Sequence, residues 1–230
     1  VAAKRGDREA KEGVVIAQTN ADNTMGIIVC VSCETDFVSK NADFVAFVQA
    51  IADAAVSNNV KSIDELKSTS LKNSTIEDLI NDKRAAIGEK IDITRFEKIE
   101  APYVASYIHG AYRIGVLVGL NKAASEAGKD IAMQIAAMNP IAVDENSVPA
   151  ETIEREKAIV TEQIQQDPKM AGKPADMVNK IAEGKLKSFF KENTLLEQAF
   201  VKDNSKTVAE HLKQTDGDLK VLGFKRVALG

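Results

Sequence analysis

One order of predicted elements occurs twice along this chain of 230 residues: a strand, a turn, a second strand, a helix and, later, a closing strand. We predict the first set at residues 13–18, 26–32, 42–56 and 91–97, and the second at 103–109, 114–120, 129–138 and 221–227. Sheets of this size must bury one face against helices. We therefore predict an α+β fold of two similar subdomains, residues 13–102 and 103–230, each a small antiparallel sheet covered by helices.

The helices of the first half carry clear start and stop signals. Apolar residues recur on one helix face after Asn41, a good N-cap, at Phe44, Phe47, Val48, Ile51, Ala52 and Ala55. Two capping boxes, at Ser62 with Glu65 and at Ser74 with Glu77, predict the starts of two more helices. The last of these is expected to end at Ile87, with Gly88 closing it in a left-handed conformation.

A helical hairpin is predicted as an insertion in the second half, at about residues 150–190. Residues 151–165 and the segment that opens at Pro174 each carry a narrow apolar stripe, and a short polar loop joins them. Narrow stripes of this kind are typical of an antiparallel coiled coil. The alternative is that both helices lie on the second sheet.

The segment Thr35-Asp36-Phe37-Val38 lies in the predicted connection between a strand and a helix. Connections are exposed and often carry functional residues. Phe37 would there present a large apolar ring beside the charge of Asp36. Alternatively, Phe37 folds inward over the helix while Asp36 caps a turn.

The two cysteines, Cys30 and Cys33, have the spacing of a redox or zinc motif. A structural zinc site needs four ligands, and the only further candidates of its usual type are His109 and His211. A strand that continues through Cys33 directs the two sulfurs to opposite faces. We therefore predict that both are small buried side chains, with a metal or dithiol protein as the rival hypothesis.

Composition and motifs exclude several classes of function. The 30 basic and 34 acidic residues nearly balance, which speaks against a nucleic-acid partner and favours a protein one. The chain has no apolar run long enough to span a membrane and no secretory signal, so we expect a soluble, cytoplasmic protein. It contains no recognisable nucleotide-binding or catalytic motif, and His109 has no partner for acid–base chemistry. We therefore expect no enzymatic activity, cofactor or metal.

Two ordered motifs resemble a known family. The run from Thr35 to Val38, followed by Lys40, Asn41 and Phe44, is similar to one signature of bacterial elongation factor Ts, and Tyr107–Gly110 with Arg113–Val118 is similar to its second signature. The family promotes nucleotide exchange on the GTPase elongation factor Tu and is not expected to bind nucleotide itself. The resemblance implies that the GTPase contacts are Thr35, Asp36, Phe37, Val38, Ile87, Gly88 and His109.

The resemblance also implies a mechanism. Phe37 would wedge into an apolar pocket of the GTPase and displace the elements that hold Mg²⁺ and the phosphates, while the region of His109 grips a second GTPase domain. Residues 1–12 are expected to be a linker to the family's N-terminal helical domain, which has no counterpart here. The alternative function is a non-catalytic scaffold in which the helical hairpin binds the partner and Phe37 belongs to the core.

Overall fold

The computed structural model describes residues 8–230, so residues 1–7 of the predicted linker lie outside the described residues. The chain divides into two compact units. The first contains the described residues up to Ala137 together with Leu219–Gly230, and the second contains Met138–Asp218. No helix within residues 8–230 is long and apolar enough to cross a membrane.

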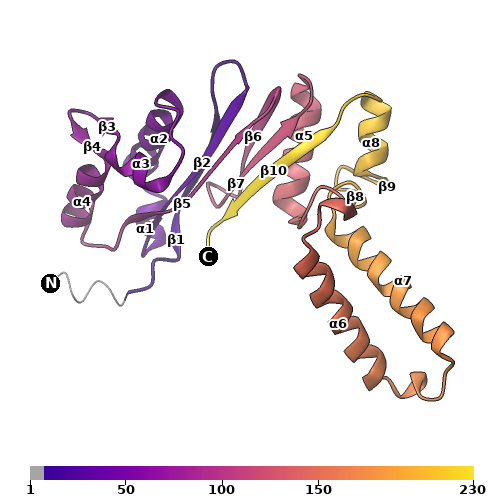
Figure 1. The fold of residues 1–230 in the computed structure, drawn as a ribbon. Coiled ribbons are helices and arrows are strands. Elements are labelled where there is room, and N and C mark those ends of the chain that lie inside the picture. Colours follow the sequence, from indigo (N-terminus) through magenta and orange to yellow (C-terminus); the bar gives the residue numbers. More distant parts are fainter. Residues whose placement is uncertain (1–7) are drawn as a thin grey trace. The chain divides into compact units, whose positions relative to one another are not determined.

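The first sheet of the larger unit has three antiparallel strands in the order β1-β2-β5 (Figure 1). The strands are β1 (Glu12–Thr19), β2 (Met25–Cys33) and β5 (Asp92–Glu100). Val15 lies opposite Cys30 in the first pair, and Val29 lies opposite Phe96 in the second. All nine residues of the central strand are buried, so both faces of this sheet are covered.

Helices cover one face of the first sheet. This layer contains α1 (Asp36–Ser39), α2 (Ala42–Ser57), α3 (Ile63–Ser68) and α4 (Ile76–Ile87), with a small hairpin of β3 (Ser70–Leu71) and β4 (Ser74–Thr75). The apolar stripe predicted on α2 is buried as expected and packs in one core with residues such as Ile16, Ile27 and Val29 of the sheet.

The second sheet, in the order β10-β7-β6, is also antiparallel. Its strands are β6 (Tyr103–His109), β7 (Ile114–Leu120) and β10 (Val221–Ala228). Helix α5 (Ser125–Met138) packs closely against this sheet, because a Cβ atom added at Gly128 would lie 2.8 Å from the Cβ of Ala105. The helix starts one turn earlier than predicted.

The two sheets pack face to face. One apolar cluster joins Val15, Ala17, Ile28 and Cys30 of the first sheet with Val104, Leu117 and Val227 of the second. Glycines make this close approach possible: a Cβ at Gly115 would lie 2.9 Å from a methyl of Val15, and one at Gly26 would lie 2.7 Å from a methyl of Leu117. The predicted sheets are therefore confirmed as parts of an α+β fold, and each has helices on one face and the other sheet on the opposite face.

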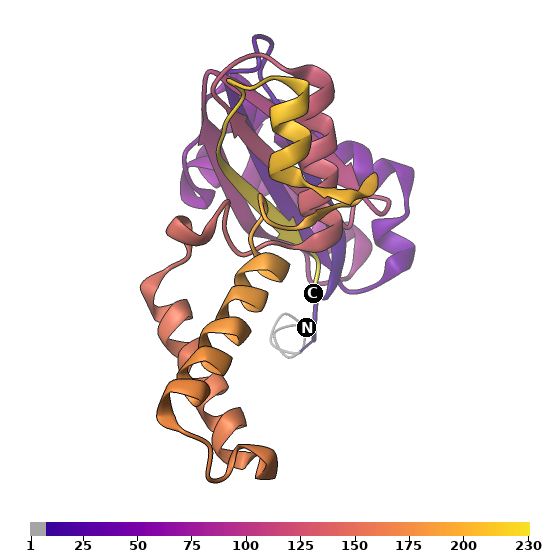
Figure 2. The same ribbon diagram turned by 90° about the vertical axis from the view of Figure 1, so that its right-hand side faces the viewer.

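The smaller unit contains the helical hairpin. Helices α6 (Ala150–Gln166) and α7 (Ala175–Asn193) run side by side in opposite directions (Figure 2). Val160 and Ile164 are buried along the pair, and a cluster around Val148, Phe189 and Phe190 closes its base. The unit also contains short 3₁₀ turns, a small hairpin and a terminal helix: η1 (Glu145–Ser147), η2 (Pro168–Met170), β8 (Ala199–Phe200), β9 (Asp203–Thr207) and α8 (Val208–Thr215).

Two local predictions were wrong. Residues 36–39 form a one-turn helix, α1, where a connection was expected, because the hydroxyl of Thr35 caps a turn there. Helix α4 has Thr75 as its N-cap in place of Ser74, because the hydroxyl of Thr75 accepts a hydrogen bond of 3.2 Å from the N–H of Asp78 in the first turn. The division into subdomains 13–102 and 103–230 stays a prediction.

Candidate partner-binding site

The two apolar residues of the short helix α1 differ in exposure. Phe37 is 85% exposed, whereas Val38 is half-buried and packs against the core beneath α2. The alternative in which Phe37 folds inward is therefore wrong. Asp36 does not cap the turn either: its carboxylate accepts a hydrogen bond of 3.0 Å from Lys40, which lowers the pKa of Asp36.

A second segment meets Phe37 across a hollow of about 420 Å³ at the surface. Ile87, the last residue of α4, contributes an exposed side chain to it, and Val38 and Phe44 supply further apolar surface. The structure thus brings together Phe37, Val38 and Ile87, although they come from segments some 50 residues apart in the sequence. Large exposed apolar side chains grouped around a hollow are typical of a surface that binds another protein.

Gly88 ends α4 in the left-handed conformation that the sequence predicts, with φ 83° and ψ 10°. Its N–H donates a hydrogen bond of 2.9 Å to the carbonyl oxygen of Arg84. Apart from the two chain neighbours of Gly88, no heavy atom of residues 8–230 lies within 4 Å of the position that a Cβ would occupy there. The backbone beside Ile87 is therefore open to close approach by another molecule.

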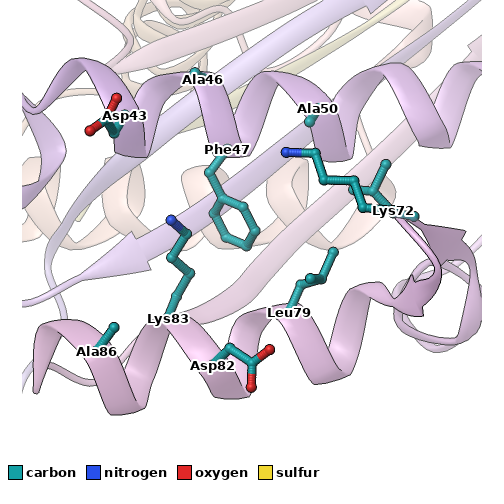
Figure 3. A pocket seen from close by; sticks show the side chains of 10 residues that line it. Asp43, Ala46, Phe47, Ala50, Lys72, Leu79, Asp82, Lys83 and Ala86 are labelled. Atoms are coloured by element: carbon teal, nitrogen blue, oxygen red, sulfur yellow. The ribbon is translucent and has the colours of Figure 1, made fainter.

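The hollow continues into a groove between α2 and α4 (Figure 3). This groove, of about 520 Å³, shares Asp43 and Lys83 with the hollow around Phe37. The amino group of Lys83 lies 5.1 Å from the centre of the Phe47 ring, a cation–π arrangement that holds the lysine stem along the groove. The apolar surface is therefore framed by charges of both signs.

The segment before Phe37 is tied to the end of α4 by Glu89. One carboxylate oxygen of Glu89 accepts hydrogen bonds of 3.0 Å from the backbone N–H groups of Glu34 and Thr35. The other accepts a bond of 2.7 Å from the hydroxyl of Thr35. Sequence reasoning missed Glu89, because its partners lie more than 50 residues away and no local pattern marks them.

His109 ends β6, beside a tight turn in which Gly110, Ala111 and Tyr112 all have positive φ. Its Nδ1 lies 3.0 Å from the hydroxyl of Tyr107, and the two rings are 5.7 Å apart. His109 is half-buried, so part of the residue is open to solvent. The hollow lined by Phe37 and Ile87 does not include His109, which makes it a separate candidate contact.

The two cysteines are free, buried and on opposite faces of the first sheet: Cys33 packs on the helix side and Cys30 in the core between the sheets. Burial, together with the charges of Glu89 and Glu12, raises the pKa of the Cys33 thiol to about 12. A thiol held protonated in this way is a poor nucleophile and metal ligand. Among residues 8–230, no group of three or more His, Cys, Asp or Glu side chains is arranged to hold a metal.

Known proteins resemble the chain over its full length. The family model described as "Elongation factor TS" matches residues 34–230. A protein of Christiangramia forsetii named Elongation factor Ts is 47% identical over 233 residues, covering 100% of this chain and 83% of the relative. Proteins of the same name from Flavobacterium psychrophilum and Nitratiruptor are 44% and 41% identical, covering all of this chain and 83% and 78% of those relatives. This chain therefore belongs to the elongation factor Ts family.

Proposed function

We propose that this protein promotes the release of GDP from elongation factor Tu and that Phe37 is the residue that anchors the complex. The exposure of the Phe37 ring is the observation that carries the proposal. A Phe that is 85% exposed adds little to the core of the free protein, whereas aromatic side chains buried at an interface dominate binding energies. Membership of the elongation factor Ts family supports the choice of partner.

Exchange by such a protein needs no covalent chemistry. Nucleotide and exchange factor bind the same GTPase, and linkage requires that each weakens the binding of the other by the same factor. Insertion of Phe37 between helices of the GTPase would move the groups that hold Mg²⁺ and the diphosphate. Because these groups provide the main attraction for GDP, their displacement speeds its release.

The other surface residues have supporting roles in this proposal. Thr35 and Val38 hold α1, and Ile87 and Gly88 extend the apolar contact around the wedge. His109 contributes a separate contact with a second domain of the GTPase, and its binding energy offsets the cost of the distortion. We propose that the protein makes no direct contact with nucleotide or nucleic acid. We place its activity in the cytoplasm.

The test is the rate at which labelled GDP leaves elongation factor Tu in the presence of the wild-type chain or of Phe37→Ala. Loss of a central aromatic anchor costs at least about 2 kcal/mol of binding, so the variant should need roughly 30-fold more protein for the same rate. Leu222→Ala is the matched control, because Leu222 is also an exposed apolar residue, at 56%, but lies in β10. Equal activity of Phe37→Ala and wild type would refute the proposal.

The scaffold alternative makes a different prediction for the same assay. If the hairpin α6–α7 were the binding element, Phe37→Ala would leave both the affinity for the partner and the rate of GDP release unchanged. The exposure of Phe37 weighs against that alternative, which assigned this residue to the core.

A further inference from the structure

The helix that carries Phe37 is too short to be stable on its own. Helix α1 has four residues, fewer than a stable helix needs without tertiary support. Phe37, Asp36 and Lys40 are all exposed, so the outer face of α1 gains little from packing. Besides the packing of Val38 against the core, contacts of the segment that precedes α1 therefore fix the orientation of the helix that carries Phe37.

Glu89 supplies that fixation. Its carboxylate accepts three hydrogen bonds from Glu34 and Thr35, and bonds to an ionised acceptor are among the stronger hydrogen bonds in proteins. The Thr35 hydroxyl donates to Glu89 and accepts from the N–H of Val38, at 3.4 Å, which starts the turn of α1. The bond to Glu89 thus directs the hydroxyl proton of Thr35 away from α1. The lone pairs of the hydroxyl oxygen are then left to accept the capping bond from the N–H of Val38.

We propose that Glu89 is a positioning residue for the wedge: through Thr35 it holds α1, and therefore Phe37, in the orientation that the partner binds. This inference rests on the proposed function. Glu89 lies two residues after Ile87 and bonds to residues two and three positions before Phe37, so one side chain links both halves of the apolar surface. Holding an anchor in its bound orientation lowers the ordering cost of association.

The first test measures the mobility of the wedge without any partner. The chain contains no Trp, so Phe37→Trp introduces a single indole at the exposed site, which is excited at wavelengths that the three Tyr residues do not absorb. In this background Glu89→Ala should clearly lower the fluorescence anisotropy of the indole. Glu89→Gln should lower the anisotropy less than Glu89→Ala, because its amide oxygen can still accept both backbone bonds although its amide nitrogen cannot accept from the Thr35 hydroxyl. Unchanged anisotropy in Glu89→Ala would overturn the proposal.

The second test is GDP release from elongation factor Tu. Glu89→Ala should lower the exchange activity about tenfold, and Glu89→Gln less than about threefold, if the role is geometric. In a Phe37→Ala background Glu89→Ala should have an effect of less than about twofold, because no anchor remains to be positioned. Equal effects of Glu89→Ala in both backgrounds, or equal losses from Glu89→Ala and Glu89→Gln, would overturn the proposal.

Thr35→Val tests the same link from the other side, including the case in which Glu89→Ala does not fold. It removes the hydroxyl while keeping the shape, and should also lower exchange. Thr75→Val is the matched control, because Thr75 caps α4 in the same way, accepting from the N–H of Asp78 at 3.2 Å. The control should lose stability but keep exchange within about twofold of wild type. Normal exchange by Thr35→Val would contradict the inference.

The two proposals fail in different ways. If Phe37→Ala exchanges normally, the proposed function is wrong and with it the role of Glu89. If Phe37→Ala is defective while folded Glu89→Ala is normal, only the positioning role is wrong.

Discussion

At the scale of single residues, a hydrogen bond between polar atoms near Phe37 determines which neighbouring apolar side chain is exposed and which is buried. The hydroxyl of Thr35 caps α1, and the turn that results leaves Phe37 outside while Val38 faces the core. Apolarity alone does not distinguish these two neighbours. Their different exposure follows from the direction of one helical turn, which a hydrogen bond sets.

Asp36→Asn is predicted to slow GDP release less than Phe37→Ala does. The carboxylate of Asp36 is exposed and already paired with Lys40, whose hydrogen bond is the main reason that the pKa of Asp36 is lowered. Asn keeps the size of the side chain and removes only this exposed charge. Both variants can be measured in one titration of elongation factor Tu, and a larger loss in Asp36→Asn would make the carboxylate the principal contact.

Cys33 is predicted to make the protein less stable in alkali. The pKa of the thiol is about 12 in the folded protein, against an ordinary value of 9.0. The contribution of this group to the free energy of unfolding is therefore complete below about pH 8.5 and is lost as the pH rises toward 12. Within this window the free energy of unfolding should fall by up to about 1.4 kcal/mol per pH unit from this group. Urea unfolding from pH 8 to 10 should give a flatter pH dependence for Cys33→Ala, and parallel curves would contradict the assignment.

At the scale of elements, the stability of two segments depends on a few positions in each. These segments are the end of α4 and the hairpin α6–α7. Gly88 has φ 83°, a conformation that costs other residues about 1 kcal/mol or more, with Asn tolerated best. Gly88→Ala should therefore be less stable than Gly88→Asn by thermal unfolding. Equal stability of the two variants would show that the cap relaxes to another conformation.

The tip of the hairpin is predicted to be dispensable for folding and exchange. Replacing residues 156–184 by a short Gly-Ser linker keeps the base cluster, including Ile153, Leu186 and Phe189, intact. The melting temperature should change by less than about 4 °C, and GDP release should be normal. Deleting residues 151–189 removes these packing residues and should cost at least about 2 kcal/mol. A tip deletion that fails to fold or to exchange would show that the hairpin supports the rest of the protein.

The strands and the longer helices were predictable because each has a period that repeats several times. The stripe from Phe44 to Ala55 spans three turns of α2, and every predicted position in it is buried. Helix α1 has a single turn, so no apolar period can repeat within it and indicate a helix. Helix α3, with only six residues, is too short for a period that repeats several times. The contact between Glu89 and Thr35 joins two segments that only the tertiary fold brings together.

At the scale of the whole larger unit, the two sheets share one core. The central strand β2 is apolar except for Ser32 and has both faces buried, which is the pattern of a strand covered on two sides. That pattern was present in the sequence, but it does not say what covers the second face. The answer depends on small residues such as Gly26 and Gly115, whose roles appear only when the sheets are in contact.

Gly115→Ala is predicted to destabilise the protein by about 1–3 kcal/mol, the usual cost of overpacking. The added methyl would meet Val15 at 2.9 Å and Ile28 at 3.2 Å, and both neighbours are stiff β-branched residues. Val15→Ala in the same chain should relieve the clash, so the double variant should be more stable than the sum of the single effects. Strict additivity in urea unfolding would mean that the sheets separate freely at this point.

The exposed ring of Phe37 also has a consequence for the free protein as a solute. An aromatic group 85% open to water invites self-association, the same process that begins aggregation. Asp36, Lys40, Asp43 and Lys83 surround it, and charged neighbours of this kind keep an apolar patch hydrated and separate. The ring can therefore stay available for a partner at high protein concentration, and neutralising Lys40 and Lys83 would lower solubility before it changed the fold.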